Sequence, residues 1–199
     1  MRPHIELFRS YAALPVLAGL LLTLQLAGGE LIDAWSSNAV LRDPSWVELF
    51  FWQLMHTGFL HLGLNLAGLG LLLVIHPNGL RGWWWAARML ACGWVGNLLF
   101  LLINGLSADG SVHIALGLSG ALHALAWMLA MDCLRQPHGK ALLGLLLIKL
   151  AYEQVWGAMP FSSLVGITVL VDVHLYAVIG AVWLGVFLRV LRRDNHPTA

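Results

Sequence analysis

Apolar residues fill long runs of this chain, and short polar segments separate the runs. A helix needs about 20 mostly apolar residues to cross a bilayer. A membrane-spanning strand would instead alternate apolar and polar positions, which these runs do not. The pattern predicts a single-domain, all-α membrane protein over residues 1–199, with six transmembrane helices at about 11–28, 55–75, 83–103, 116–131, 141–156 and 171–190.

Composition supports the same class of protein. The chain is 59% hydrophobic and 11% charged, whereas a soluble domain carries about 25% charged residues. The net charge of +1 gives no reason to expect a nucleic-acid partner. Cys92 and Cys133 lie in or beside apolar runs, so we expect small buried hydrophobes and no disulfide framework. No cofactor and no metal site is indicated.

Basic residues indicate the orientation in the membrane. Of the 11 Lys and Arg residues, all but Arg42 and Lys149 precede the first run, lie at the end of the sixth or after it, or lie at or near the second–third and fourth–fifth connections. Positive residues stay on the cytoplasmic side. Both termini are therefore expected in the cytoplasm, and the segments 29–55, 104–116 and 157–172 are expected outside.

Polar residues inside the runs are unevenly placed. Such residues are costly in a bilayer and are functional candidates. They gather at the start of the second, fourth and sixth runs, which is the outer end of each predicted helix. At one depth the three helix starts bring together His56, His61, Asn65, Gly117, Ser119, Gly120, His123, Asp172 and His174.

The chemistry of this group suggests acyl transfer. Ser119 stands among glycines that permit close backbone approach, at a helix start whose free N–H groups can hold an oxyanion. His174 can act as a general base. His61 and Asn65 are four apart, hence on one face, and can add oxyanion donors. Asp172 is only two residues from His174 and points elsewhere, so we expect a Ser–His dyad without a carboxylate.

His123 is a rival base, because it lies four residues after Ser119 on one helix face. We favour His174, since it approaches the serine from across the cavity. We expect His123 to stack on or hydrogen-bond to His174 and to fix its tautomer. Helix 171–190 is expected to approach helix 116–131 closely through a stripe of small residues, Ala177, Ala181 and Gly185.

Taken together, these motifs resemble the rhomboid family of intramembrane serine proteases. The family's His-x4-His-x3-Asn is matched by His56, His61 and Asn65, its Gly-x-Ser-Gly by residues 117–120, and its sixth-helix histidine by His174. The resemblance implies a six-helix rhomboid-like bundle in which Ser119 is the nucleophile. It further implies that His174 is the base, that His61 and Asn65 line the oxyanion hole, and that His56 supports them.

Two departures from the family pattern narrow the resemblance. Alanines stand at 177 and 181, where rhomboids carry glycines after the histidine. His123 stands four residues after Ser119, where rhomboids often have an aromatic residue. The resulting Ser-Gly-x-x-His arrangement is similar to that of rhombosortases, a bacterial subfamily. That similarity implies a membrane-embedded substrate with a carboxy-terminal tail made of a glycine pair, an apolar helix and a basic end. It also implies the bacterial inner membrane, with the active site opening to the periplasm.

The fifth run carries an unusual polar pair, Lys149 and Glu153. Because they are four residues apart, they can form an ion pair that only satisfies itself. Alternatively, they form a polar substrate-facing edge, since this helix resembles the rhomboid lateral gate.

Two other functions compete with proteolysis. A non-catalytic rhomboid-like membrane chaperone is the main alternative, but pseudoproteases typically lose the serine or the histidine. A small transporter or channel would carry charges along a path through the bilayer, whereas the polar residues here gather in the outer half.

Overall fold

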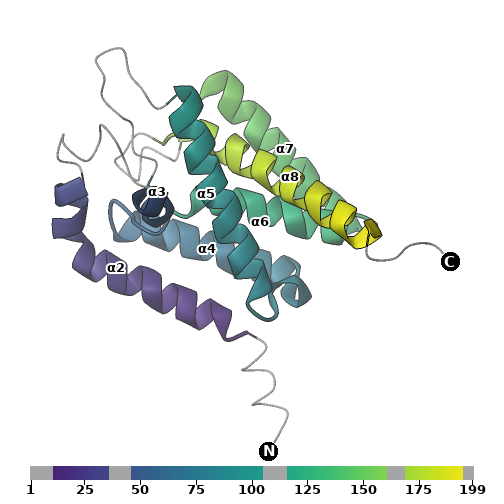
Figure 1. Cartoon of the computed structure of the whole chain (residues 1–199), viewed down its shortest axis with the longest axis horizontal. Coiled ribbons are helices and arrows are strands. Elements are labelled where there is room, and N and C mark those ends of the chain that lie inside the picture. The colour runs from purple at the N-terminus through teal and green to yellow at the C-terminus, as the bar shows by residue number, and fades with distance from the viewer. Residues whose placement is uncertain (1–10, 36–45, 105–115, 161–168, 195–199) are drawn as a thin grey trace, which may run out of the picture.

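The computed structural model describes residues 11–35, 46–104, 116–160 and 169–194. Figure 1 shows that these segments form a bundle of helices; they contain seven α-helices and a 3-10 helix, and no strand. The predicted all-α class is therefore confirmed. The elements are α2 (Ala13–Trp35), α3 (Trp46–Trp52), α4 (Phe59–Ile75), η1 (Pro77–Leu80), α5 (Trp84–Asn104), α6 (Ser119–Asp132), α7 (Pro137–Trp156) and α8 (Asp172–Asp194).

Each of the six predicted ranges overlaps one helix, but several ends differ, and α2 continues to Trp35, well past the predicted end at residue 28. α4 begins at Phe59, so His56 lies in the turn before it rather than in a helix. α7 begins at Pro137, earlier than predicted, because proline suits the first turn of a helix. The short helix α3 was not predicted, since its seven residues are too few to show a hydrophobic period.

Within the described residues, two helices are long and apolar enough to cross a membrane: α5, and α8 over Asp172–Leu191. Shorter apolar helices cover Ala13–Ala27 and α4. Large apolar side chains are also exposed on the outside of α4, α5, α7 and α8, among them Val74, Leu102, Ile148 and Trp183. Leu62, Leu122, Leu125 and Ala177 belong instead to the buried core between the helices.

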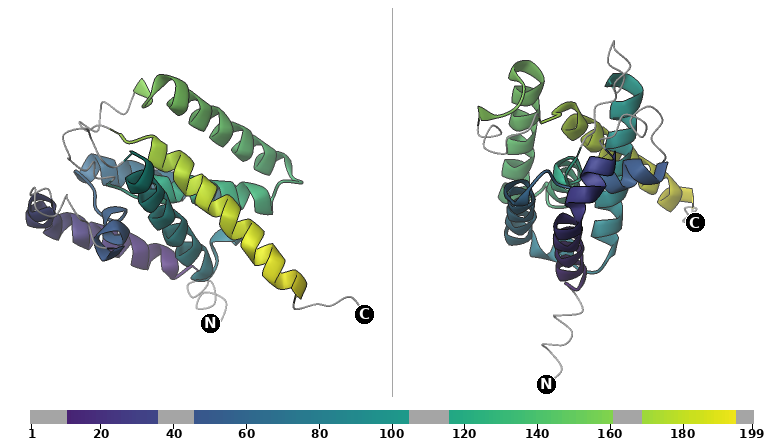
Figure 2. Two further views of the ribbon diagram at one scale, coloured as in Figure 1. Left: turned by 45° about the horizontal axis from the view of Figure 1, so that its top comes forward. Right: turned by 90° about the vertical axis from the view of Figure 1, so that its left-hand side faces the viewer.

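α8 packs mainly against α5 and α6, and α2 and α7 lie at opposite edges of the bundle (Figures 1 and 2). Small residues allow this close packing. A Cβ atom on Gly96 would lie 2.9 Å from the backbone nitrogen of Ala177, and one on Gly120 would lie 2.9 Å from Val173 Cγ1. Ala177 and Ala181 are buried as expected, but Gly185 faces open space. Of the three small residues predicted to allow close helix packing, only Ala177 and Ala181 are therefore buried between helices.

The start of α2, the α4–α5 connection and the end of α8 lie at one end of the bundle (Figures 1 and 2). Arg81, in that connection, donates a hydrogen bond to the Tyr11 hydroxyl just before α2. Arg88 of α5 and Arg189 of α8 line one cavity together with Asp132, the last residue of α6. Arg81, Arg88 and Arg189, three of the basic residues on which the predicted orientation rests, thus lie at this end of the described bundle.

We predict that Gly96→Ala destabilises the bundle, because the added methyl group meets the α8 backbone. Overpacking of this kind typically costs about 1–3 kcal/mol. Gly70→Ala in α4 is the matched control: it has open space around it, and replacing a helical glycine by alanine stabilises a helix by up to about 1 kcal/mol. Thermal unfolding of the two purified variants checks the ranking, and equal melting temperatures would contradict the packing.

Candidate active site

The fold brings Ser119 and His174 together, although 55 positions separate them in the sequence. Ser119 is the first residue of α6, and His174 lies in the first turn of α8. Their side chains are joined by a hydrogen bond of 3.0 Å between Ser119 Oγ and His174 Nε2. His174 is buried and Ser119 is partly exposed, so the hydroxyl can be reached while its partner is shielded.

A carboxylate lies on the other side of the imidazole, contrary to expectation. Glu153 Oε2 of α7 is 2.9 Å from His174 Nδ1, and both side chains are buried. The prediction of a dyad without a carboxylate was wrong in this respect. It considered only Asp172, which accepts a hydrogen bond from Asn104 near the surface. The residues therefore form a chain of three, Ser119–His174–Glu153.

This arrangement fixes the tautomer of His174. A carboxylate can only accept hydrogen bonds, so Nδ1 must carry the proton that Glu153 receives. In the neutral ring Nε2 is then unprotonated and accepts the hydrogen of the Ser119 hydroxyl. His174 is thus held in the protonation state that a general base for the serine requires.

Lys149 forms the predicted ion pair with Glu153, one helical turn apart. Its side chain is 31% exposed, whereas the Glu153 side chain is 2% exposed. Glu153 therefore faces the interior of the bundle, which does not fit the alternative of a substrate-facing edge. The adjacent ammonium group favours the ionised form of this buried carboxylate.

His123 stacks on His174, as predicted. The two rings lie 4.1 Å apart at an angle of 12°. His123 Nδ1 donates to the Ser119 carbonyl oxygen at 2.6 Å, so this ring is tied to its own helix. His123 supports His174 by ring contact, and Glu153 rather than His123 fixes the tautomer.

The predicted oxyanion residues lie beside the backbone that leads to the serine. A Cβ atom on Gly117 would lie 2.5 Å from His61 Cε1 and 3.5 Å from Asn65 Nδ2. Gly117 also has φ +103°, a conformation that residues with a side chain rarely adopt. The close approach of α4 to Ser119 therefore depends on glycine at this position.

His56 supports the same segment from the turn before α4. Its Nε2 accepts the Leu118 backbone N–H at 3.5 Å, and its Nδ1 lies 3.2 Å from the Leu54 carbonyl oxygen. The His56 and His61 rings contact each other edge to face at 4.9 Å. His56, His61 and Asn65, in and just before α4, thus lie close to Gly117, just before α6.

Sequence reasoning missed the anchor that holds this neighbourhood in place. The Trp52 carbonyl oxygen, at the end of α3, accepts the Gly117 N–H at 3.1 Å. Asn97 of α5 donates to the Leu49 carbonyl oxygen, and Gln53 donates to that of Leu90. These buried amides tie α3 to α5, and polar residues within an apolar run were the available signal.

Glu153, His174 and His123 also form a group with donor atoms within 4.8 Å of one another. Metal binding here is disfavoured by the residues already present. Lys149 places a positive charge on Glu153, and His174 uses both ring nitrogens, on Glu153 and Ser119. The donor set is therefore better suited to proton transfer than to a cation.

In comparisons with protein-family models, curated proteins and solved structures, nothing matches this chain. The inference of function consequently depends on the residues and their geometry. The arrangement can activate a serine hydroxyl: a base contacts it, an ionised carboxylate orients the base, and a helix start and two polar side chains lie beside it.

Proposed function

We propose that this chain is an intramembrane serine endopeptidase of the rhomboid type, with Ser119 as the nucleophile. The observation that carries the proposal is the hydrogen-bonded chain from Ser119 Oγ through both nitrogens of His174 to Glu153. A buried histidine with a purely structural role needs hydrogen-bond partners for its ring nitrogens. It does not need a serine hydroxyl on one nitrogen and a carboxylate on the other. The same three roles recur on unrelated folds in enzymes that transfer acyl groups.

In the proposed reaction, Ser119 Oγ attacks the carbonyl carbon of the scissile peptide bond. Its proton passes to His174 Nε2, and Glu153 stabilises the imidazolium that forms. His174 then gives this proton to the leaving amine as the C–N bond breaks. Water repeats the sequence on the acyl-enzyme, which releases the new carboxylate and restores the Ser119 hydroxyl.

The oxyanion of the tetrahedral intermediate needs hydrogen-bond donors. The first residues of α6 have N–H groups without intrahelical partners, at the positive end of the helix dipole. His61 and the Asn65 amide lie close to Gly117, two residues before the start of α6. These groups are the donors that the proposal assigns to the oxyanion, and removing one such donor typically costs about 10²–10³ in kcat.

The proposal places the chain across a bilayer as six helices, with both termini in the cytoplasm. Its support is the exposed apolar surface, the two long apolar helices, and the placement of Arg81, Arg88 and Arg189 at one end. α6 has 14 residues and is about 21 Å long, shorter than a hydrocarbon core of about 30 Å. If the end of α6 near Arg88 and Arg189 lies at the inner surface of the membrane, then Ser119, at the start of α6, lies below the outer surface.

The substrate class follows from this placement. Backbone inside a stable helix is hydrogen-bonded, so a transmembrane substrate must unwind before a serine can attack it; glycine costs about 1 kcal/mol relative to alanine in a helix. We propose an exported protein with a glycine-pair tail signal as the substrate. The enzyme would then lie in the bacterial inner membrane, opening to the periplasm, as in the rhombosortases that the sequence resembles.

We predict that Ser119→Ala and His174→Ala each abolish processing of a reporter carrying a glycine pair, an apolar helix and a basic end. Loss of the nucleophile or the base removes several orders of magnitude of rate, and the double variant adds little. Thr23→Ala is the control, because that exposed hydroxyl only bonds the Gly19 carbonyl of its own helix. Processing is measured by immunoblot of the released product after co-expression.

Substantial processing by folded Ser119→Ala would contradict the catalytic assignment and favour a chaperone-like function. A reporter with Leu-Leu in place of the glycine pair separates the substrate class from the chemistry. If that reporter is cut as efficiently, the rhombosortase-type substrate is wrong, whereas the serine mechanism still holds.

We predict that Glu153→Gln lowers kcat with little change in the amount of folded protein. The amide preserves the shape but can no longer stabilise the imidazolium, and the corresponding change in a Ser–His–Asp triad costs about 10⁴-fold. Asp172→Asn is the matched control, because Asp172 bonds Asn104 and not His174. A loss smaller than about tenfold for Glu153→Gln would return the site to a dyad.

A further inference from the structure

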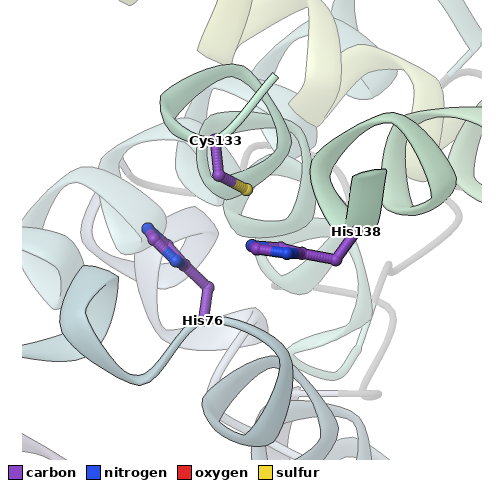
Figure 3. A group of neighbouring side chains, drawn as sticks. All are labelled: His76, Cys133 and His138. Carbon is purple, nitrogen blue, oxygen red and sulfur yellow. The ribbon is translucent and has the colours of Figure 1, made fainter. Parts of the chain in front are cut away.

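A second group of reactive side chains lies at the opposite end of α6 from Ser119. His76 caps the end of α4, Cys133 caps the end of α6, and His138 is the second residue of α7. Figure 3 shows the thiol and the His138 ring turned toward one space between the three helix ends, with the His76 ring beside that space. One donor atom from each lies within 4.8 Å of the other two.

Local backbone structure holds these residues close together. Gly139 follows His138 and lies directly against the carbonyl group of Cys133, where any Cβ atom would clash. Gly79 lies against the His76 ring, and a Cβ atom there would be 2.6 Å from His76 Cδ2. Both close approaches therefore depend on glycine, and they fix the start of α7 and the turn after α4 beside the end of α6.

The donor set is that of a borderline-soft divalent metal. Imidazole nitrogen and thiolate sulfur suit Zn²⁺, whereas Mg²⁺ and Ca²⁺ prefer oxygen ligands, which this group does not offer. Zn–N and Zn–S bonds of about 2.0–2.3 Å place tetrahedral ligand atoms roughly 3.3–3.6 Å apart. The donors therefore need to close by no more than about 1.5 Å, and His138 is exposed and can rotate to allow it.

The thiol already has a weak partner. Cys133 Sγ donates to the Leu129 carbonyl oxygen at 2.9 Å, a bond within its own helix. That bond accounts for a buried cysteine at a helix end, but it does not account for two imidazoles from other helix ends with a nitrogen within 4.8 Å of the same sulfur. Cys133 is also a free cysteine, so the sulfur is available as a ligand.

We propose that His76, Cys133 and His138 form a Zn²⁺ site that fastens the ends of α4, α6 and α7 to one another. On binding, the Cys133 thiol proton is released to solvent and the sulfur bonds the metal as thiolate. Three protein ligands leave a fourth position for water. The site is about the length of α6 away from Ser119 and does not depend on the proposed protease function.

The test is metal binding by the purified full-length protein in detergent. Zn²⁺ is titrated in competition with a chromophoric chelator, and Co²⁺ replaces it for absorption spectra. We expect one equivalent of metal and a thiolate-to-cobalt charge-transfer band. Cys133→Ser should lose the band and weaken Zn²⁺ binding by more than about 100-fold, because losing a ligand exceeds the 10–100-fold effect of losing a residue that only orients one.

Three further variants make the outcome decisive. Cys92→Ser is the matched control, because Cys92 is the other free buried cysteine and lies on α5 outside this group; it should bind as the unchanged protein does. His138→Gln alters an exposed side chain and should weaken binding even if Cys133→Ser fails to fold. Absence of stoichiometric binding, binding unaffected by His138→Gln, or binding lost only in His123→Phe would overturn the site.

Discussion

The hydrogen bond between His174 Nδ1 and Glu153 is the interaction on which the rest of the site depends. It places the proton on one ring nitrogen and leaves the other free to face Ser119. A carboxylate buried in a helical bundle would be costly alone, and Lys149 offsets that cost from the more exposed side of α7. Three helices are thereby connected through one imidazole, with α7 supplying the charge, α8 the ring and α6 the hydroxyl.

Close helix packing makes this geometry possible. Gly96 and Gly120 bring α5 and α6 against the first turns of α8, so the His174 ring reaches the serine without a long flexible side chain. Gly117 likewise allows α4 to lie close to the start of α6, because only a residue without a Cβ fits beside His61 in this backbone conformation. The small residues therefore set the distances between the helices, and these distances allow the polar side chains to form hydrogen bonds with one another.

Much of this arrangement can be predicted from the sequence, because its signals are local or periodic. Apolar runs located the long helices, and polar residues at the starts of three runs identified Ser119 and His174 as neighbours. Contact between Glu153 and His174 was not expected, because Lys149 offered Glu153 a sufficient partner one turn away. Which way a helix faces depends on packing between distant segments, and the sequence pattern of α7, apolar on most sides, does not specify it. The group of His76, Cys133 and His138 was missed for the same reason, since these residues are brought together only by the packing of three helix ends.

The central claim is that Ser119 is an activated nucleophile and not a packing residue. Labelling with a fluorophosphonate probe tests this most directly, because such a probe bonds a serine oxygen only when a base activates it. The account predicts labelling of the folded protein at Ser119, confirmed by peptide mass spectrometry, and loss of that labelling in His174→Ala. Failure of the folded protein to label, or equal labelling of His174→Ala, would contradict it.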